Sequence, residues 1–149
     1  MNTCKFSIRL VFIAAVLSVF SSLSSAAQLI TNEEAKLPAA TKFASRGGLT
    51  RGPGIKIISP IDSKVKGAFD MKFQFEPHGG ATVDPASVKM TYLKSPLVDI
   101  TDRIKPYISA NGIDMAKAEI PPGEHQFKVQ VSDNEGRVGS TVVNLVVEK

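Results

Sequence analysis

The residues best suited to chemistry lie in one short polar stretch, Asp133, Asn134 and Glu135. Ca²⁺ takes six or more oxygen ligands, and carboxylate and amide side chains in loops can supply them. The stretch is therefore a candidate calcium site at one end of the folded domain. The alternative, which Gly136 favours, is that Asp133 and Asn134 hydrogen-bond the backbone of their own turn and bind no ion.

The chain has two histidines, His78 and His125. By alternation, His125 shares a strand face with Phe127, Val129 and Val131. A metal ligand or general base there needs a partner, and two isolated histidines without an adjacent carboxylate cluster do not make a zinc or copper site. We expect the His125 ring to cover the end of the core, with a ring nitrogen bonded to a backbone carbonyl or water.

Motifs for catalysis are missing from the sequence. It contains no Gly-x-Ser-x-Gly elbow for a serine nucleophile. Its carboxylates are scattered, and it has few aromatic residues to line a sugar cleft of the kind in which paired glycosidase carboxylates act. The sequence predicts a protein that is not an enzyme, with no catalytic residues and no cofactor.

Residues 1–27 are predicted to be a secretory signal peptide. Lys5 and Arg9 precede an apolar run, residues 10–20, which is about half the length that spans a bilayer. Ser25-Ala26-Ala27 then fits the small-x-small rule for cleavage. An uncleaved membrane anchor is the alternative. We expect the protein to be exported to the periplasm or outside the cell, with no transmembrane segment after cleavage.

Cleavage also removes Cys4, the only cysteine. The mature chain then has no disulfide framework, thiol nucleophile or cysteine metal site, so its core alone must hold the fold together. Loss of Lys5 and Arg9 from the 18 basic side chains leaves 16, against 14 acidic ones. This small excess and the export signal argue against nucleic acid as a partner.

Residues 28–53 are predicted to form a mostly disordered, flexible leader. They show little apolar periodicity, and their glycines raise the entropic cost of order. Thr31 and Glu34 do match a capping box, which favours a turn or two of helix near residues 32–36.

From residue 54 onward the chain alternates between short strands and turn residues. The clearest run is residues 69–76, with large apolar side chains on one face. A final hairpin turns at Asp133 and Gly136. Its inward residues are Phe127, Val129, Val131, Val143, Leu145 and Val147. Further strands are predicted over 55–57, 88–92, 97–100 and 116–120, the last with Ala116 and Ala118 inward, and a helical turn with Ile104 buried within 101–108.

About seven strands, turn signals every eight to twelve residues and no helical period predict an all-β fold. The expected architecture is an antiparallel two-sheet β-sandwich over residues 54–149, preceded by the signal peptide and the flexible leader. A small barrel and a jelly roll are the alternatives.

Two stretches resemble the bacterial immunoglobulin-like domains of exported proteins. Residues 83–89 (Val-Asp-Pro-Ala-Ser-Val-Lys) open a strand as in those domains. Residues 120–125 (Ile-Pro-Pro-Gly-Glu-His), with the alternating strand and the turn 132–137 that follow, are similar to their closing hairpin. The resemblance covers residues 54–149 and implies an immunoglobulin-like sandwich, without the core tryptophan and paired cysteines of antibody domains. It implies no particular function, because such sandwiches have many unrelated roles.

We expect an exported, non-enzymatic binding or structural module that acts by macromolecular interaction in the bacterial cell envelope or outside the cell. A protein or envelope partner would bind at a strand edge or a loop end. Val142 and Val146 are expected to point outward and could form a docking face, unless the leader covers them. The alternative is a small periplasmic ligand or calcium-binding carrier that uses carboxylates at the loop ends.

Overall fold

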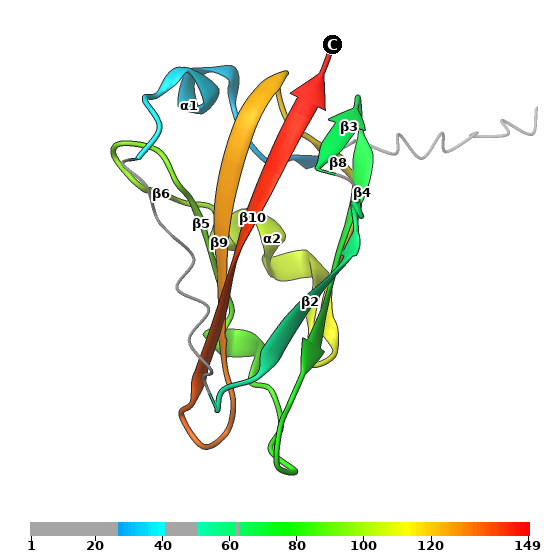
Figure 1. Ribbon diagram of the computed structural model, residues 1–149, viewed down its shortest axis with the longest axis vertical. Helices are drawn as coiled ribbons and strands as arrows, with labels where there is room; N and C mark the ends of the chain where they lie inside the picture. The colour runs from blue at the N-terminus through cyan, green and yellow to red at the C-terminus, as the bar shows by residue number, and fades with distance from the viewer. Residues whose placement is uncertain (1–26, 41–50, 62) are drawn as a thin grey trace, which may run out of the picture.

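The computed structural model describes residues 27–40, 51–61 and 63–149, which form two sheets packed face to face (Figure 1). In the first sheet the strands follow the order β1, β8, β4, β2, and β7 also pairs with β8. In the second sheet the order is β3, β10, β9, β5, β6. The first sheet comprises β1 (Ala27–Gln28), β2 (Gly54–Ser59), β4 (Phe69–Glu76), β7 (Ile108–Ser109) and β8 (Gly112–Glu119). The second comprises β3 (Lys64–Lys66), β5 (Lys89–Tyr92), β6 (Val98–Asp99), β9 (Gly123–Ser132) and β10 (Val138–Glu148).

This arrangement confirms the predicted all-β, two-sheet sandwich. Three of its strands, β1, β3 and β7, are not predicted by the sequence. Each is only two or three residues long, too short to show an alternating pattern. Two of them, β1 and β3, pair in parallel with β8 and β10, whereas the other pairs are antiparallel. The predicted signal peptide, apart from Ala27, lies outside the described residues.

A single apolar core lies between the sheets, and alternation along the long strands builds it. On β4, Met71, Phe73 and Phe75 are buried, as the sequence predicts. On the hairpin, the inward residues are all buried as predicted: Phe127, Val129, Val131, Val143, Leu145 and Val147. Each large apolar side chain that is fully buried contributes about 1.5–3 kcal/mol, so this layer dominates the stability of the domain.

A bulge in β8 changes which of its residues face the core. Met115 and Ala118 are both buried, although strict alternation would place them on opposite faces. Between them the backbone of Lys117 has a φ of +54°, which few residues other than glycine adopt. The Lys117 N–H donates to the carboxylate of Asp70 at 3.1 Å. Ala116 is therefore exposed, and the prediction that it points inward is wrong.

Short helices occupy connections between the strands. α1 (Asn32–Lys36) begins at the predicted capping box, in which Thr31 and Glu34 exchange side-chain-to-backbone hydrogen bonds of 2.9 and 3.2 Å. Ile104 is fully buried in the helical turn predicted within 101–108. The other short helices are η1 (Pro85–Ser87), α2 (Thr101–Ile104) and η2 (Lys105–Tyr107). In the described part of the chain, no helix has both the length and the apolar character needed to cross a bilayer.

Residues 27–40, here called the N-terminal segment, belong to the sandwich, which differs from the flexible leader expected for them. β1 pairs with the edge of β8, and the next two residues, Leu29 and Ile30, are fully buried in the core. At the other end of the segment, Ala39 bridges to Lys94, between β5 and β6. The segment thus links the edges of both sheets. Two adjacent apolar residues show no period, so only packing against both sheets reveals their role. Residues 41–50 of the expected leader lie outside the described residues.

Arg103 of α2 binds the N-terminal segment through its side chain. The Arg103 guanidinium donates to both carboxylate oxygens of Glu34, at 2.7 and 2.8 Å, and to the backbone carbonyl of Leu29 at 2.7 Å. Such two-pronged, charge-assisted pairs are among the stronger polar contacts in proteins. The hydrogen bond from Arg103 is the main reason why the pKa of Glu34 falls to about 2.

We expect Glu34→Gln to destabilise the protein by about 1–2 kcal/mol at pH 7, because it removes one charge of this partly exposed pair, which solvent screens. The folded-state pKa of Glu34 lies below its ordinary value of 4.5, so its stabilisation is complete above that pH and is lost as the pH falls toward 2. Urea unfolding at pH 7, 4 and 2.5 checks this. The wild type and the variant should converge at the lowest pH, and a constant difference would contradict the assignment.

Candidate functional site

The candidate calcium residue Asp133 forms the centre of the β9–β10 turn. One carboxylate oxygen accepts the backbone N–H groups of Glu135 at 3.0 Å and Arg137 at 2.9 Å. The other accepts Nε of Arg137 at 2.7 Å, and the side chain is fully buried. Burial opposes ionisation, but the hydrogen bonds from Arg137 and Glu135 outweigh it and hold the pKa of Asp133 below its ordinary value.

The other two calcium candidates also have partners within the protein. The Asn134 side chain accepts the N–H of Thr82 at 3.0 Å, and its own N–H donates to the Thr82 carbonyl at 2.9 Å. Glu135 forms an ion pair with Arg137 at 3.1 Å. Within the described residues, no three acidic or metal-ligating side chains gather at one point. The arrangement is that of a self-bonded turn, the alternative that the sequence favours.

We expect Asp133→Ala to lower the melting temperature by roughly 5–15 °C, because it leaves the backbone donors of the turn and Arg137 without their buried acceptor. The loss should be the same with Ca²⁺ and with a chelator in differential scanning calorimetry. Asp102→Ala is a matched control, since the Asp102 side chain is exposed and its one ion pair among the described residues is with Lys105. A loss for Asp133→Ala seen only in the presence of Ca²⁺ would contradict the turn role.

His125 belongs to a buried aromatic cluster at the opposite end of β9. Its Nε2 lies 2.8 Å from the carbonyl oxygen of Pro121, which can only accept, so Nε2 carries the proton. Its Nδ1 lies 2.7 Å from the hydroxyl of Tyr92, which therefore donates to it. The rings of Tyr92 and Phe127 stack with centroids 5.2 Å apart. The expected structural role of His125, with a backbone carbonyl as its partner, is confirmed.

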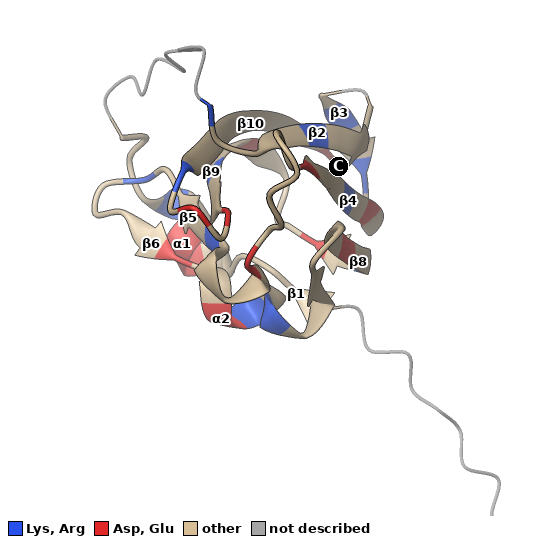
Figure 2. Ribbon diagram, turned by 90° about the horizontal axis from the view of Figure 1, so that it is seen from below, with Lys and Arg blue, Asp and Glu red and all other residues tan. Residues whose placement is uncertain are grey.

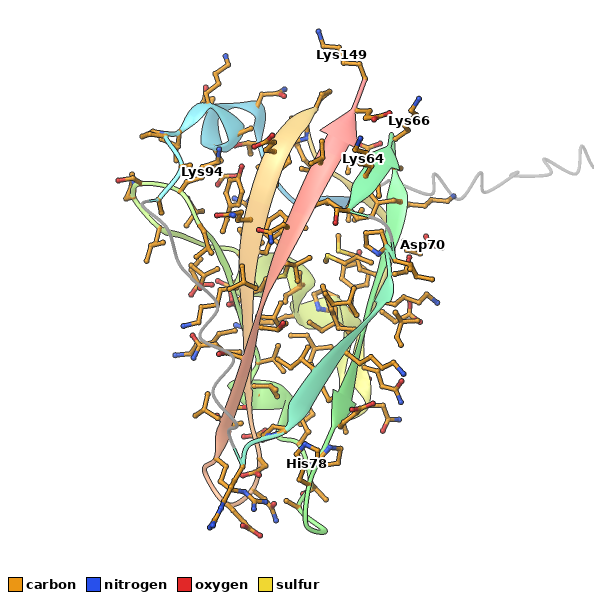
Figure 3. The ribbon with its side chains drawn as sticks, in the orientation of Figure 1. Lys64, Lys66, Asp70, His78, Lys94 and Lys149 are labelled. Atoms are coloured by element: carbon orange, nitrogen blue, oxygen red, sulfur yellow. The ribbon has the colours of Figure 1, made fainter. Side chains whose placement is uncertain are left out.

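Burial sets the ionisation of this cluster. It lowers the pKa of His125, and the nearby Lys94 ammonium lowers it further. It also raises the pKa of Tyr92 to about 12, with a smaller contribution from Glu34. Both groups are therefore neutral at pH 7. His78 lies far from this cluster, beside the β9–β10 turn, where its carbonyl accepts Nη2 of Arg137 at 3.1 Å (Figure 3).

We expect Tyr92→Phe to cost about 1–2 kcal/mol of unfolding free energy, because the buried Nδ1 of His125 loses its donor. Urea unfolding at pH 8 measures this. The pKa of His125 is lowered in the folded state, so the wild type should lose stability as the pH falls below about 6.5. His125→Gln should lack that loss, whereas the exposed His78→Gln should keep it. An unchanged pH profile in His125→Gln would contradict the assignment.

A third location lies where the chain passes from the first sheet to the second. β2 pairs with β4 at one edge of the first sheet, and the next strand, β3, pairs with β10 in the second. The connection crosses the open side between the sheets and leaves a hollow of about 270 Å³. We call this hollow the β2–β10 seam. Its described lining residues are Ile57, Pro60, Ile61, Ser63, Val142, Val143 and Asn144. Asp62, within the crossing, lies outside the described residues.

The two strands approach most closely at the start of β10. A Cβ atom on Gly139 would lie 1.9 Å from the carbonyl oxygen of Pro53, so only glycine allows this contact. Further along β10, the connection between β2 and β3 passes over the hollow. Ile61, which lies on this connection, is 90% exposed. The seam is therefore closed at Gly139 and accessible near Ile61.

Among the described residues, part of the edge of β10 along the seam has no strand partner. β10 pairs with β9 along almost its whole length, but with β3 only at residues 146–148. The Val146 N–H donates to the carbonyl of Ser63 at 2.6 Å. Because backbone groups alternate in direction along a strand, those of Val142 and Asn144 point the same way, into the seam. No described residue accepts a hydrogen bond from their N–H groups.

Val142 and Val146 point away from the core, as predicted, but they do not form one apolar face. Between them the Gln126 amide donates to the side chain of Asn144 at 2.8 Å. Val146 is in register with Lys64 of β3, so β3 rather than the leader lies beside it. Both valines are half-buried. Of the two, only Val142 lines the seam.

Two further hollows have charged linings. One, of about 260 Å³, lies between the N-terminal segment and the end of β8 and includes Glu119. The other, of about 230 Å³, lies over β4 and β8 beside the ion pair of Lys72 and Asp114. The described lining of the seam carries no charged side chain. The seam is therefore an uncharged hollow that lies beside main-chain groups with no partner among the described residues.

Comparison with known proteins gives similarity of fold only. No protein family model matches the chain, and no curated protein matches it. Among solved structures, CopC from Methylosinus trichosporium OB3b is similar at 17% sequence identity and a TM-score of 0.42, over 64% of this chain and 94% of that one. The fibronectin(III)-like modules of Clostridium thermocellum CbhA are similar at 17% identity and a TM-score of 0.37, over 64% of this chain and 46% of that one.

Proposed function

We propose that the protein is an exported, non-enzymatic binding module that recognises another macromolecule through the β2–β10 seam. The observation that carries the proposal is the edge of β10 at Val142 and Asn144, where no described residue pairs with the main-chain N–H groups, directly beside a hollow with no charged side chain in its described lining. An extended segment of a partner can add to such an edge by main-chain hydrogen bonds, while its side chains enter neighbouring pockets. Few edges of this kind stay uncovered without a role, because they promote aggregation.

The chemistry of the buried polar groups supports a binding role over catalysis. The groups with shifted pKa values in the core and the turn, Tyr92, His125 and Asp133, each hold a structural hydrogen bond. None of them lines the seam. The polar side chains of the seam are a hydroxyl and an amide, Ser63 and Asn144, which bind but do not move protons near neutral pH.

The predicted export is compatible with the fold. Cleavage after Ala27 would leave the buried pair Leu29 and Ile30 in the mature chain, together with the hydrogen bond from the Leu29 N–H to the Glu119 carbonyl at 3.0 Å. The alternative of a calcium carrier has less support, because Asp133 already uses both carboxylate oxygens within its turn.

A photoreactive benzoylphenylalanine in place of Ile61 should cross-link a partner in the native cell envelope, with and without a chelator. The same group in place of Leu97 is the control, since Leu97 is also exposed but lies between β5 and β6, away from the seam. We expect Val142→Lys to abolish the cross-link from position 61, because it places a long charged side chain in a hollow whose described lining carries no charge. Val138→Lys, on an exposed residue at the start of β10, should leave the cross-link intact.

Mass spectrometry of the cross-linked product identifies the partner. Equal capture from positions 61 and 97, or capture that survives Val142→Lys, would show that the seam is not the binding site. Thermal unfolding of each variant confirms that it is folded.

A further inference from the structure

We infer that Lys94 forms a binding site for an oxyanion, either a carboxylate or a phosphate group. The site lies where the N-terminal segment meets the connection between β5 and β6. The inference goes beyond the proposed function, because Lys94 does not line the seam. Only 9% of the surface of Lys94 is exposed. A lysine is almost never buried to this extent unless its charge is paired, so the ammonium group calls for an anion.

No described residue supplies that anion. Lys94 takes part in none of the ion pairs between described residues, and its ammonium group donates no hydrogen bond to any of them. Its Nζ lies 5.5 Å from the centroid of the Tyr92 ring. This cation–π contact occupies one side of the ammonium group and leaves other N–H donors without an acceptor.

The Nζ atom of Lys94 is nevertheless within reach of a solute. Among the described residues, each side-chain nitrogen or oxygen that is sealed from solvent has a hydrogen-bond partner. Since Nζ has no such partner, it keeps contact with solvent, while the rest of the side chain is covered. On one side lies the N-terminal segment, where the Pro38 carbonyl accepts the N–H of Ser95 at 2.9 Å. The charge thus lies at the end of a covered stem, open to a ligand from outside.

The remaining residues of the chain offer no carboxylate for Lys94 either. Residues 1–26 contain no aspartate or glutamate, and neither do residues 41–50, which follow the N-terminal segment. Asp62 precedes β3, and β3 is the opposite edge of the second sheet from β6. An anion that pairs with Lys94 therefore comes from another molecule.

The groups around Lys94 leave a positive charge unbalanced. Glu34 is the nearby carboxylate, but both its oxygens accept Arg103. Figure 2 shows the acidic residues of α1 beside α2, and Figure 3 shows Lys94 below α1. Tyr92 and His125 are neutral at pH 7. Burial lowers the pKa of His125 and the Lys94 charge lowers it further, so these two groups interact.

An oxyanion fits this environment better than an uncharged ligand. Carboxylate and phosphate oxygens accept charge-assisted hydrogen bonds from an ammonium group, and these are stronger than bonds between neutral groups. A bound oxyanion would also neutralise a charge that is costly to bury without a partner. Because the ring of Tyr92 covers one side of Nζ, the ligand approaches from the solvent side.

The test titrates the mature protein with sodium phosphate and, separately, with sodium acetate at pH 7, and follows the ring resonances of His125 by NMR. Sodium chloride at the same ionic strength is the reference. We expect saturable shifts of His125 with at least one of the two anions. Tighter binding of acetate would assign the site to a carboxylate, and tighter binding of phosphate to a phosphate group. The resonances of the exposed His78 should not respond.

The matched variants are Lys94→Met and Lys36→Met. Methionine at position 94 keeps an apolar stem of similar length but removes the charge, so binding should weaken at least tenfold. Lys36 is exposed in the last turn of α1, and its replacement should leave binding unchanged. Thermal unfolding of each variant confirms that it is folded.

A second readout needs no variant. A bound anion cancels the Lys94 charge that, together with burial, lowers the pKa of His125. Saturation with the anion should therefore raise the pKa of His125 in an NMR titration. In Lys94→Met the pKa should already be higher without the anion, and the anion should not raise it further.

Four results would overturn the inference. Shifts of His125 no larger than those with chloride would show that no oxyanion binds, and binding that survives Lys94→Met would place it elsewhere. An equal loss in Lys36→Met, or equal shifts of His78, would reduce the effect to general surface charge. Loss of the cross-link from position 61 would remove the proposed function but would leave this inference standing, because the two sites share no lining residue.

Discussion

The apolar core between the two sheets must be covered along both edges of the sandwich, where the sheets do not join. The rest of the structure depends on which segments of the chain cover these two edges. On one side the N-terminal segment runs from the edge of β8 to the connection between β5 and β6 and buries Leu29 and Ile30. The bidentate contact between Arg103 and Glu34 holds it there. On the other side the chain itself crosses from β2 to β3, which covers the core less completely and leaves the seam.

The polar groups at the ends of the sandwich also help to keep water out of the core. A buried polar atom is costly unless it has a hydrogen-bond partner, and no buried side-chain nitrogen or oxygen in the described residues lacks one. Asp133 anchors the turn at one end of β9, and the pair of Tyr92 and His125 fills the other end. Residue types that serve catalysis or metal binding elsewhere act here as structural acceptors and donors.

The seam differs from these places because some of its main-chain N–H groups have no hydrogen-bond partner among the described residues. Main-chain contacts close the core at Gly139 and at β3, but between them Val142 and Asn144 present backbone N–H groups without partners among the described residues. Sheet edges are usually blunted by charge, bulges or cover.

The sequence by itself determined the elements whose pattern is local. Alternation predicted β4 and the final hairpin with their inward residues, the capping box predicted α1, and Gly136 favoured Asp133 as the acceptor of its own turn. These features depend on residues only a few positions apart, so local sequence patterns are sufficient to predict them. The two-sheet fold follows from several such strands together.

Only the tertiary structure decided the rest, because the deciding contacts join residues far apart in the chain. Strands of two or three residues, such as β1 and β3, have no period and exist only where a long strand offers an edge. The bulge at Lys117 shifts the register of β8 against β4, which is why Ala116 is exposed while Ala118 is buried. The seam itself depends on where β3 stops pairing with β10, and no local pattern specifies that point.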